Sequence, residues 1–383
     1  MSAEVNLPGG PFRFTGHGAE FAAPGRPFLA RIAYAAAPVV ADPLGENVPG
    51  APAALDWEAT LSLRRRLWAH GFGVAEGMDT AQRGMGLDYP PTRELIRRSA
   101  WEAQQCGGRI VAGVATDQLP AGPASLDDIR KAYAEQLHHV QETGATPVLM
   151  CSRHLAAAAR SADDYLSVYS ELLSQADQPV ILHWLGEVFD PALAGYWGST
   201  DVAIATRTVR TLIDSHRALV AGIKVSLLDE EMEIGLRRVL PAGVRMYTGD
   251  DFHYPELIKG DELGFSDALL GVLAVIAPPA AAAFRALDAA DSGAYERILA
   301  PTVPLARHLF AAPTYYYKTG ITFLHWIAGH QDHFTMVGGL QSGRSPRHLA
   351  ALLPLADAAG VLPDAELAAH RARAWLTTVG LGG

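Results

Sequence analysis

Residues 221–229 read AGIKVSLLD and place a lysine inside an apolar run. Leu219, Val220, Ile223 and Val225 flank Lys224 on both sides. A short apolar run rich in β-branched residues indicates a buried strand. A buried ammonium group costs free energy unless it is paired or loses its proton. We therefore expect Lys224 either to reach water at the end of the strand or to take part in chemistry.

Seven further apolar runs are similar to 219–226, and nearly all of the eight precede a helical pattern. They lie at 28–40, 71–78, 109–116, 146–152, 179–184, 244–251 and 267–277. Among the helical patterns, 125–144 begins at Ser125, a good N-cap residue. Strict alternation predicts parallel strands with right-handed crossovers, and eight units are the number in a closed (β/α)8 TIM barrel of the α/β class. A doubly wound open sheet is the alternative, but no Gly-rich phosphate loop follows the first run.

The strand patterns stop at about residue 285, which suggests three parts. We expect an N-terminal arm or hairpin over 1–27, the barrel over 28–292 and a C-terminal helical domain over 293–383. The run at 268–284 is interrupted by Pro278 and Pro279 and is too short to span a bilayer.

The composition limits the partners that we expect. Hydrophobic residues make up 49% of the 383 residues, enough for a large core, and the formal net charge is −10. No basic stripe favours nucleic acid, and no basic amphipathic segment favours a membrane surface. The first residues lack the pattern of a secretory signal, and Cys106 and Cys151 are too few for a disulfide framework. We expect a cytoplasmic protein.

Polar residues gather where four of the predicted strands end, which is where barrel enzymes carry their chemistry. They are Glu76, Asp79 and Thr80 after the second run, His183 in the fifth, Lys224 in the sixth, and Asp250, Asp251 and His253 after the seventh. Their convergence on one face of the barrel predicts a site there.

Lys224 has two interpretations. A lysine amine attacks a carbonyl only when it is neutral, and an apolar barrel interior lowers its ordinary pKa of about 10.4. In the alternative, Lys224 pairs with Asp250 or Asp251. His183 is a candidate general acid or base, or a core histidine that only packs. Asp250 and Asp251 are candidates for binding substrate hydroxyls, holding a metal or capping the next helix.

Three further segments attract attention. The run HWIAGHQDHF at 325–334 carries His330 and His333 at helical spacing, but we favour a polar helix end over a metal site because no known metal-binding spacing is present. SRH at 152–154 is a candidate anion site. We expect TYYYKTG at 314–320 to pack between the C-terminal helices, with Lys318 at the surface.

The series of segments resembles the dihydrodipicolinate synthase and N-acetylneuraminate lyase family of class I aldolases over roughly residues 28–365. The matching segments are QPVILHW (178–184), GIKVS (222–226), YTGDD (247–251), GFSDALLGVLAVIAP (264–278), Pro304-Leu305 and GLQSGRSPRHLAALLPLADAAGVL (339–362). The resemblance implies a barrel with C-terminal helices, a homodimer or homotetramer, and a Schiff base at Lys224.

Two positions depart from the family pattern. The family's second strand usually ends in a G-T-T-G-E or G-S-T-G-E loop that binds the carboxylate of a 2-oxo acid, whereas AEGMDTAQ stands here. The fifth strand usually ends in Tyr-Asn, with the tyrosine shuttling protons, whereas His183 and Trp184 stand here. Pyruvate itself is therefore in doubt as the substrate.

We expect a lyase or aldolase in which Lys224 forms an imine with a small carbonyl substrate, a 2-oxo acid or a sugar-derived compound. His183 is expected to shuttle protons. Asp79, Thr80, Asp250, Asp251 and Glu76 are expected to bind substrate. No organic cofactor is needed, because the lysine forms the electron sink, and we assign no metal.

Two alternatives stay open. One is a metal-dependent barrel isomerase or hydrolase, with ligands drawn from Glu76, Asp79, His183, Asp250, Asp251 and His253. The other is a barrel that binds a small molecule without turnover, since barrels support many functions.

Overall fold

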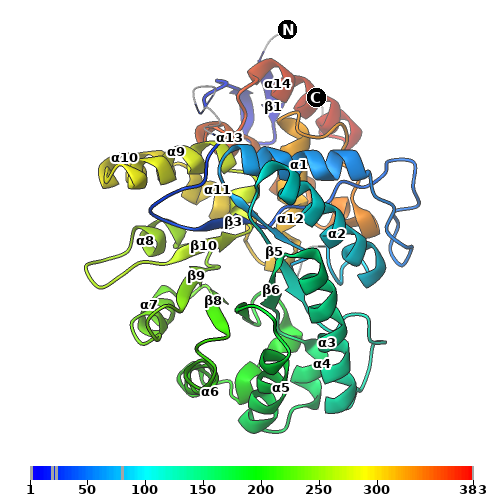
Figure 1. Cartoon of the computed structure of the whole chain (residues 1–383). Helices are drawn as coiled ribbons and strands as arrows, with labels where there is room; N and C mark the ends of the chain where they lie inside the picture. The colour runs from blue at the N-terminus through cyan, green and yellow to red at the C-terminus, as the bar shows by residue number, and fades with distance from the viewer. Residues whose placement is uncertain (1–2, 19–20, 22–24, 79–81, 382–383) are drawn as a thin grey trace.

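A closed barrel of eight parallel strands forms the centre of the molecule in the computed structural model, which describes residues 3–18, 21, 25–78 and 82–381 (Figure 1). Neighbouring strands follow the order β10-β3-β4-β5-β6-β7-β8-β9. Each predicted apolar run contains one strand, so the predicted (β/α)8 barrel is confirmed. The strands are β3 Ala33–Ala35, β4 Gly73–Glu76, β5 Ile110–Val114, β6 Thr146–Leu149, β7 Val180–Leu185, β8 Val220–Ser226, β9 Arg245–Thr248 and β10 Asp267–Leu270.

Alternate residues of each strand pack into two separate apolar layers. The inner layer fills the barrel and contains Tyr34, Ala75, Val111, Val148, Ile181, Tyr247 and Leu269. The residues between them, such as Val74 in β4 and Ile223 in β8, pack in a larger layer against the surrounding helices. One step along a strand therefore decides whether a side chain faces the barrel interior or the helices.

Helices cover the outside of the barrel, and their ends follow local sequence signals. The Ser125 hydroxyl accepts a hydrogen bond from the N–H of Asp128 at 3.1 Å, which confirms the predicted N-cap. No helix in the described part of the chain combines the length and the apolarity needed to cross a membrane. The helices in and around the barrel are α1 Trp57–Ala69, α2 Tyr89–Cys106, α3 Leu126–Thr143, α4 Arg153–Ala158, α5 Ala162–Ser174, η1 Pro191–Leu193, η2 Tyr196–Gly198, α6 Val202–Ser215, α7 Glu230–Arg237, α8 Tyr254–Lys259, η3 Val272–Ala274 and α9 Ala277–Asp288.

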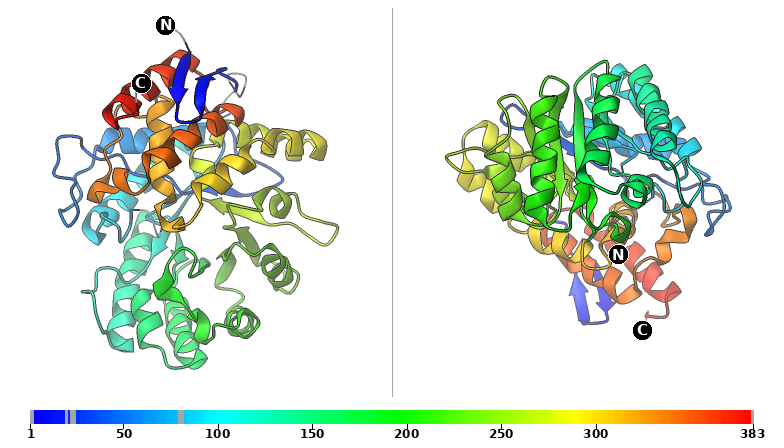
Figure 2. Two further views of the ribbon diagram at one scale, coloured as in Figure 1. Left: turned by 180° about the vertical axis from the view of Figure 1, so that it is seen from behind. Right: turned by 90° about the horizontal axis from the view of Figure 1, so that it is seen from below.

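A helical region follows the barrel, as predicted, and both chain ends lie beside it (Figure 2). The hairpin of β1 Glu4–Leu7 and β2 Gly10–Arg13 lies next to the C-terminal helices, and the Thr15 hydroxyl donates to the Asp357 carboxylate at 2.8 Å. The helices are α10 Ser292–Leu299, α11 Thr302–Leu309, η4 Thr314–Tyr316, α12 Tyr317–Ile327, η5 Val337–Ser342, α13 Pro346–Ala358 and α14 Ala365–Thr378.

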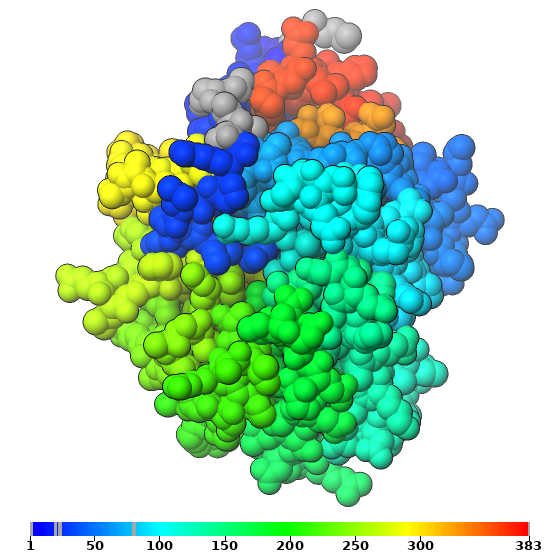
Figure 3. Space-filling model, in the orientation of Figure 1, coloured from blue at the N-terminus to red at the C-terminus, as the bar shows by residue number. Residues whose placement is uncertain are grey.

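The segment before β3 lies on the surface between helices of the barrel and α9 (Figure 3). The N–H groups of Leu29 and Ala30 both donate to Oδ1 of Asp288, the last residue of α9, at 2.8 Å. These bonds tie the start of the barrel to its end. The division of the chain at residues 27 and 292 stays a prediction.

Candidate active site at the carboxyl end of the barrel

Lys224 lies on the inner face of β8, in the layer that fills the barrel. Its neighbours Ile223 and Val225 belong to the outer apolar layer, so the alternation of the strand turns Lys224 inward. Its residue surface is only 7% exposed. In the barrel register Lys224 pairs with His183 of β7 on one side and Tyr247 of β9 on the other. The lysine side chain is thus held inside the barrel between two other polar residues.

Gly249, just after β9, leaves the space that Lys224 occupies. A Cβ atom at this position would lie 2.7 Å from Cε of Lys224 and 2.7 Å from the carbonyl oxygen of Val225, both far inside van der Waals contact. It would also collide with the hydroxyl of Ser226. The glycine of the YTGDD segment therefore has a steric reason: any side chain would displace Lys224.

Asp251 is the acidic group of this site. It is 3% exposed, and its Oδ1 accepts a hydrogen bond from the N–H of Val272 at 2.8 Å. Burial raises the pKa of Asp251 to about 7, with the negative charge of Asp250 adding to the rise, while the Val272 N–H and the charge of Lys224 only partly oppose it. Asp251 can therefore gain or lose a proton near neutral pH.

His183 is fully buried beside Lys224. Its Nε2 lies 3.2 Å from the hydroxyl of Ser226, within hydrogen-bonding distance. Burial and the charge of Lys224 hold the pKa of His183 well below its ordinary value. The imidazole of His183 is therefore neutral at neutral pH. It can form hydrogen bonds or accept a proton, but it rarely carries a second proton that it could donate. Its role as a proton shuttle stays a prediction.

Both carboxylate oxygens of Asp250 are engaged with residues of the turn that contains it. Its Oδ1 accepts from the N–H groups of Phe252 and His253 at 2.8 and 3.0 Å, and its Oδ2 lies 2.8 Å from Nδ1 of His253. These bonds are those of a turn that precedes α8. Asp250 does not cap the helix itself, because the N-cap residue is His253 and no side chain caps α8. The two adjacent carboxylates thus differ: Asp251 accepts from the N–H of Val272 and is affected by the charge of Lys224, whereas Asp250 shapes the loop.

Glu76 does not join Lys224, which corrects the expectation that it binds substrate. Its inward neighbour Ala75 belongs to the inner layer, so the side chain of Glu76 points outward to α1 and α2. There Nε and Nη2 of Arg64 donate to its two oxygens at 2.8 Å each, and the Ser99 hydroxyl donates at 2.7 Å. Both side chains are buried. Glu76 is part of a buried ion pair between β4 and the helices.

The other residues that the sequence analysis singled out have different outcomes. Asp79 and Thr80 lie outside the described residues, so their proposed contact with substrate stays a prediction. Lys318 was expected at the surface, which is wrong: it is 4% exposed on α12, within the packed C-terminal region. The pair His330 and His333 does not share a helix face, because α12 ends at Ile327. Within the described ranges no group of three or more His, Cys, Asp or Glu side chains is arranged to hold a metal ion.

A cavity of about 570 Å³ lies at the carboxyl ends of β5, β6 and β7. Leu149 pairs with Leu182, so Met150, which lines the cavity, lies level with His183 and two strands away from Lys224. The thiol of the lining residue Cys151 lies 3.2 Å from the carbonyl oxygen of His183. The cavity is therefore adjacent to the layer that holds Lys224.

The sequence analysis did not single out Thr116 or Asp117 of this cavity, and it named Ser152 only within the candidate anion site at 152–154. Thr116 ends the third apolar run, Asp117 follows it, and Ser152 ends the fourth run. The same signal was present at all these strand ends. What the sequence did not show is that the chain leaves an open space there.

Solved structures with the same fold are dihydrodipicolinate synthases. The enzyme from Aquifex aeolicus is 14% identical with a TM-score of 0.66, covering 87% of this chain and 99% of its own. The 4-hydroxy-tetrahydrodipicolinate synthase of Methylacidiphilum fumariolicum SolV is 16% identical with a TM-score of 0.64, covering 88% and 98%. The Acinetobacter baumannii dihydrodipicolinate synthase, solved with pyruvate, is 15% identical with a TM-score of 0.64, covering 87% and 100%.

The molecule is therefore a barrel of the dihydrodipicolinate synthase fold class, with a divergent sequence. Identities this low establish the fold alone. Within this class the chain belongs to the family described as protein of unknown function, DUF993, whose model matches residues 13–381. No curated protein matches the sequence.

Proposed function

We propose that the protein is a lyase of the Schiff-base type, in which the amine of Lys224 forms an imine with a small carbonyl substrate. The observation that carries the proposal is a lysine buried on the inner face of the barrel beside an acid that titrates near pH 7. The shared fold with dihydrodipicolinate synthases supports it, including one solved with the carbonyl compound pyruvate.

The chemistry requires a neutral amine and a group that moves protons. In the proposed reaction Nζ of Lys224 attacks the carbonyl carbon, the oxygen takes up protons, and it leaves as water. The protonated imine then withdraws the electron pair of an adjacent C–C or C–H bond. Reprotonation of that carbon and hydrolysis of the imine release the product and restore the amine.

We assign the proton transfers to Asp251 in the first place. It accepts a proton as a carboxylate and donates one as an acid, and its pKa of about 7 suits both roles at neutral pH. His183 and Ser226 form a neutral hydrogen-bonded pair that orients the substrate beside Lys224. The class of carbonyl substrate follows from the test below.

Borohydride trapping tests the imine. The chain has four lysines, Lys131, Lys224, Lys259 and Lys318, so a reduced adduct is mapped among few sites. We would incubate the protein with pyruvate, other 2-oxo acids and sugar-derived aldehydes or ketones, add borohydride, and record intact and peptide masses. The expected result is a single adduct on Lys224.

Lys318→Ala is the matched control, because Lys318 is the other buried lysine. We expect Lys224→Ala to abolish the adduct and Lys318→Ala to retain it at Lys224. An adduct on Lys318, or none with any compound in a protein that gains activity with added metal, would overturn the proposal. Native mass measured on the same samples tests the implied homodimer or homotetramer.

Asp251→Asn tests the proposed role of Asp251 in proton transfer. A group that must be ionised to accept a proton loses this ability as the pH falls below its pKa. We therefore expect the trapping rate of the wild type to decrease below about pH 7, and Asp251→Asn to be slower and to lose this inflection. An unchanged inflection in the variant would assign it to another group.

A further inference from the structure

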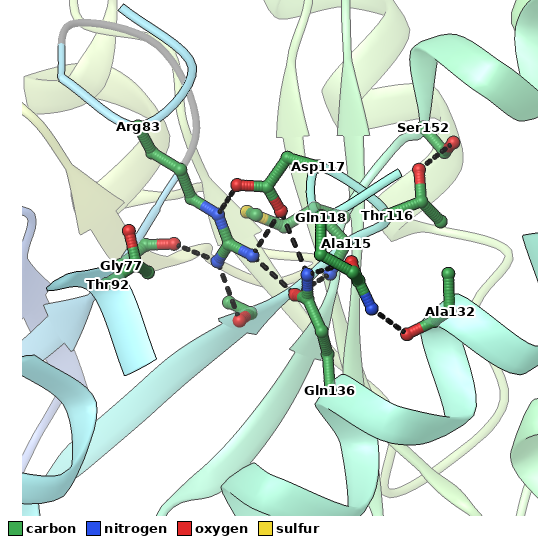
Figure 4. Close-up of polar contacts among 12 residues, drawn as sticks. Gly77, Arg83, Thr92, Ala115, Thr116, Asp117, Gln118, Ala132, Gln136 and Ser152 are labelled. Carbon is green, nitrogen blue, oxygen red and sulfur yellow. Dashed lines mark hydrogen bonds and ion pairs between the residues drawn. The ribbon is translucent and has the colours of Figure 1, made fainter. Parts of the chain in front are cut away.

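Four polar side chains in the wall of the cavity at the ends of β5, β6 and β7 donate their hydrogen bonds within the protein: Arg83, Thr116, Ser152 and His154. Arg83 shows this most fully (Figure 4). Its Nε and one Nη2 N–H donate to the two carboxylate oxygens of Asp117 at 3.0 and 2.7 Å. Nη1 donates to the carbonyl oxygens of Gly77 and Gly113 at 2.7 and 2.9 Å, and Nη2 also donates to Gln136. All five guanidinium N–H groups are used.

The partner of Arg83 is an ionised acceptor. Burial raises the pKa of Asp117, but the charge of Arg83 and hydrogen bonds from Arg83 and Gln136 outweigh it and leave the pKa below its ordinary value. The Asp117 side chain is 25% exposed and lines the cavity. A carboxylate has about four lone-pair positions, so Asp117 keeps the capacity to accept from a ligand.

Three side chains, His154, Thr116 and Ser152, form a chain of hydrogen bonds in another part of the wall. The direction of donation along this chain is determined at its two ends. Nε2 of His154 lies 3.1 Å from the carbonyl oxygen of Pro120, which only accepts, so Nε2 carries the hydrogen. In the neutral ring Nδ1 then accepts from the Thr116 hydroxyl at 3.0 Å. Thr116 in turn accepts from the Ser152 hydroxyl at 2.6 Å. The other end is fixed because the N–H of Leu155 donates to the Ser152 oxygen at 3.1 Å.

Both hydroxyl hydrogens are therefore used inside the chain. Thr116 and Ser152 are buried, and each has one lone pair left for a ligand. Together with Asp117 they make this wall an array of acceptors.

The remaining arginine of the wall, Arg153, is paired with an acid through one of its five N–H groups. Nε of Arg153 donates to Oδ2 of Asp190 at 2.5 Å, and Oδ1 of Asp190 accepts from the N–H of Ala192 at 3.1 Å. An anion in the cavity would lie near the carboxylates of Asp117 and Asp190. The arrangement therefore disfavours the anion site expected for SRH at 152–154.

We propose that this cavity binds a polyhydroxylated carbon chain, whose hydroxyl groups donate to Asp117, Thr116 and Ser152. The volume of about 570 Å³ suits a small molecule. Leu119, Leu185 and Leu193 line the same space and give the carbon skeleton an apolar surface. The link to catalysis rests on the proposed function, since the carbonyl end of this chain is taken to reach Lys224.

Equilibrium binding tests the subsite without catalysis. We would titrate the whole protein with xylitol, 1,5-pentanediol and glutarate, three five-carbon compounds, by ligand-observed NMR. Xylitol is expected to bind at least about tenfold more tightly than the other two, because only it offers several donors. Tighter binding of glutarate would overturn the proposal and restore the anion site.

Matched variants locate the binding. Thr116→Val removes one hydroxyl at nearly constant volume, and Ser152→Ala is the second variant if the first fails to fold. Each is expected to weaken xylitol binding about tenfold. Thr211→Val, on the exposed face of α6, is the control and is expected to leave binding unchanged. Equal binding by the wild type, Thr116→Val and Ser152→Ala would place the ligand elsewhere.

Two further results separate this inference from the proposed function. Xylitol binding that persists in Lys224→Ala supports the subsite even if no imine can be trapped. Conversely, D-erythrose and butanal have four carbons each, and the subsite predicts faster trapping of D-erythrose on Lys224. Trapping of both at equal rates would keep the imine and overturn the subsite.

Discussion

Lys224 and Glu76 are both charged residues of barrel strands, both buried, and they face opposite layers. Glu76 points to the helices, where Arg64 and Ser99 donate to its two oxygens in a sealed contact. Lys224 points into the barrel, where its charge acts on Asp251, an acid whose burial raises its pKa to about 7. Under the proposed function, strand alternation, rather than charge or burial, would separate a structural charge from a chemical one.

The largest expected effect is the loss of imine trapping when Lys224 is replaced. Lys224→Met removes the amine but keeps an unbranched side chain of similar length, so imine trapping should fall by at least about a thousandfold. The midpoint of urea unfolding should change less than in the Glu76 variant below. A variant that still traps carbonyl compounds at another residue would remove the distinction.

Removing the carboxylate of Glu76 should affect the stability of the fold instead of imine trapping. Glu76→Ala leaves the guanidinium of Arg64 buried without its carboxylate, which should lower the unfolding free energy by about 3–5 kcal/mol. Urea denaturation measures this loss.

Glu58→Ala is the control for that loss, because it removes the exposed partner of Arg65, and it should cost less than about 1 kcal/mol. Equal effects of the two substitutions would mean that the buried pair contributes no more than a surface pair.

Adding a methyl group at Gly249 sharpens the comparison, because it disturbs the inner layer without adding or removing a charged group. Gly249→Ala should destabilise the fold by about 1–3 kcal/mol through overpacking against Lys224. It should also reduce trapping by displacing the amine. Gly235→Ala, where a Cβ atom meets nothing within 4 Å, is the control. Trapping at the wild-type rate in Gly249→Ala would show that the lysine does not need its present position.

The smallest expected effect, measured over one pH unit, concerns another buried acid, Glu233 of α7. Burial raises its pKa from 4.5 to about 8, and the Ser266 hydroxyl donates to its Oε1 at 2.7 Å. Between these values the unfolded chain has lost this proton while the folded protein retains it. The unfolding free energy should therefore decrease with rising pH, by up to roughly 1.4 kcal/mol per pH unit, and level off above pH 8.

Glu233→Gln should remove this dependence. Asp251 acts in the same direction up to about pH 7, so urea unfolding between pH 7 and 8 isolates the contribution of Glu233. An identical slope in the variant and the wild type over this interval would show that Glu233 is ionised in the folded protein.

Much of the site could be found from the sequence because strand ends are local features. The apolar flanks of Lys224 located β8, and the YTGDD segment located Gly249 and Asp251. Sequence reasoning did not separate Asp250 from Asp251, since that depends on which carboxylate reaches Val272 of the next segment. It also treated Glu76 as facing the site, although its inward neighbour was Ala75.

Sequence reasoning failed where a residue depends on packing between distant elements. Lys318 was placed at the surface because nothing local buries a lysine, and only the packing of α12 within the C-terminal region covers it. The cavity is a similar case. Thr116, Asp117 and Ser152 are ordinary strand-end residues until β5 and β6 lie side by side.

The sequence by itself determined the alternation of strands and helices, the number of barrel strands and the place of Lys224 within one of them, because these depend on the periodicity of neighbouring residues. Only the tertiary structure decided which charges are paired and which face open space. Arg64 meets Glu76, and Arg83 meets Asp117, across 12 and 34 residues of chain. Closure of the barrel selects such partners, since a buried polar group must bond with whatever the folded chain places beside it.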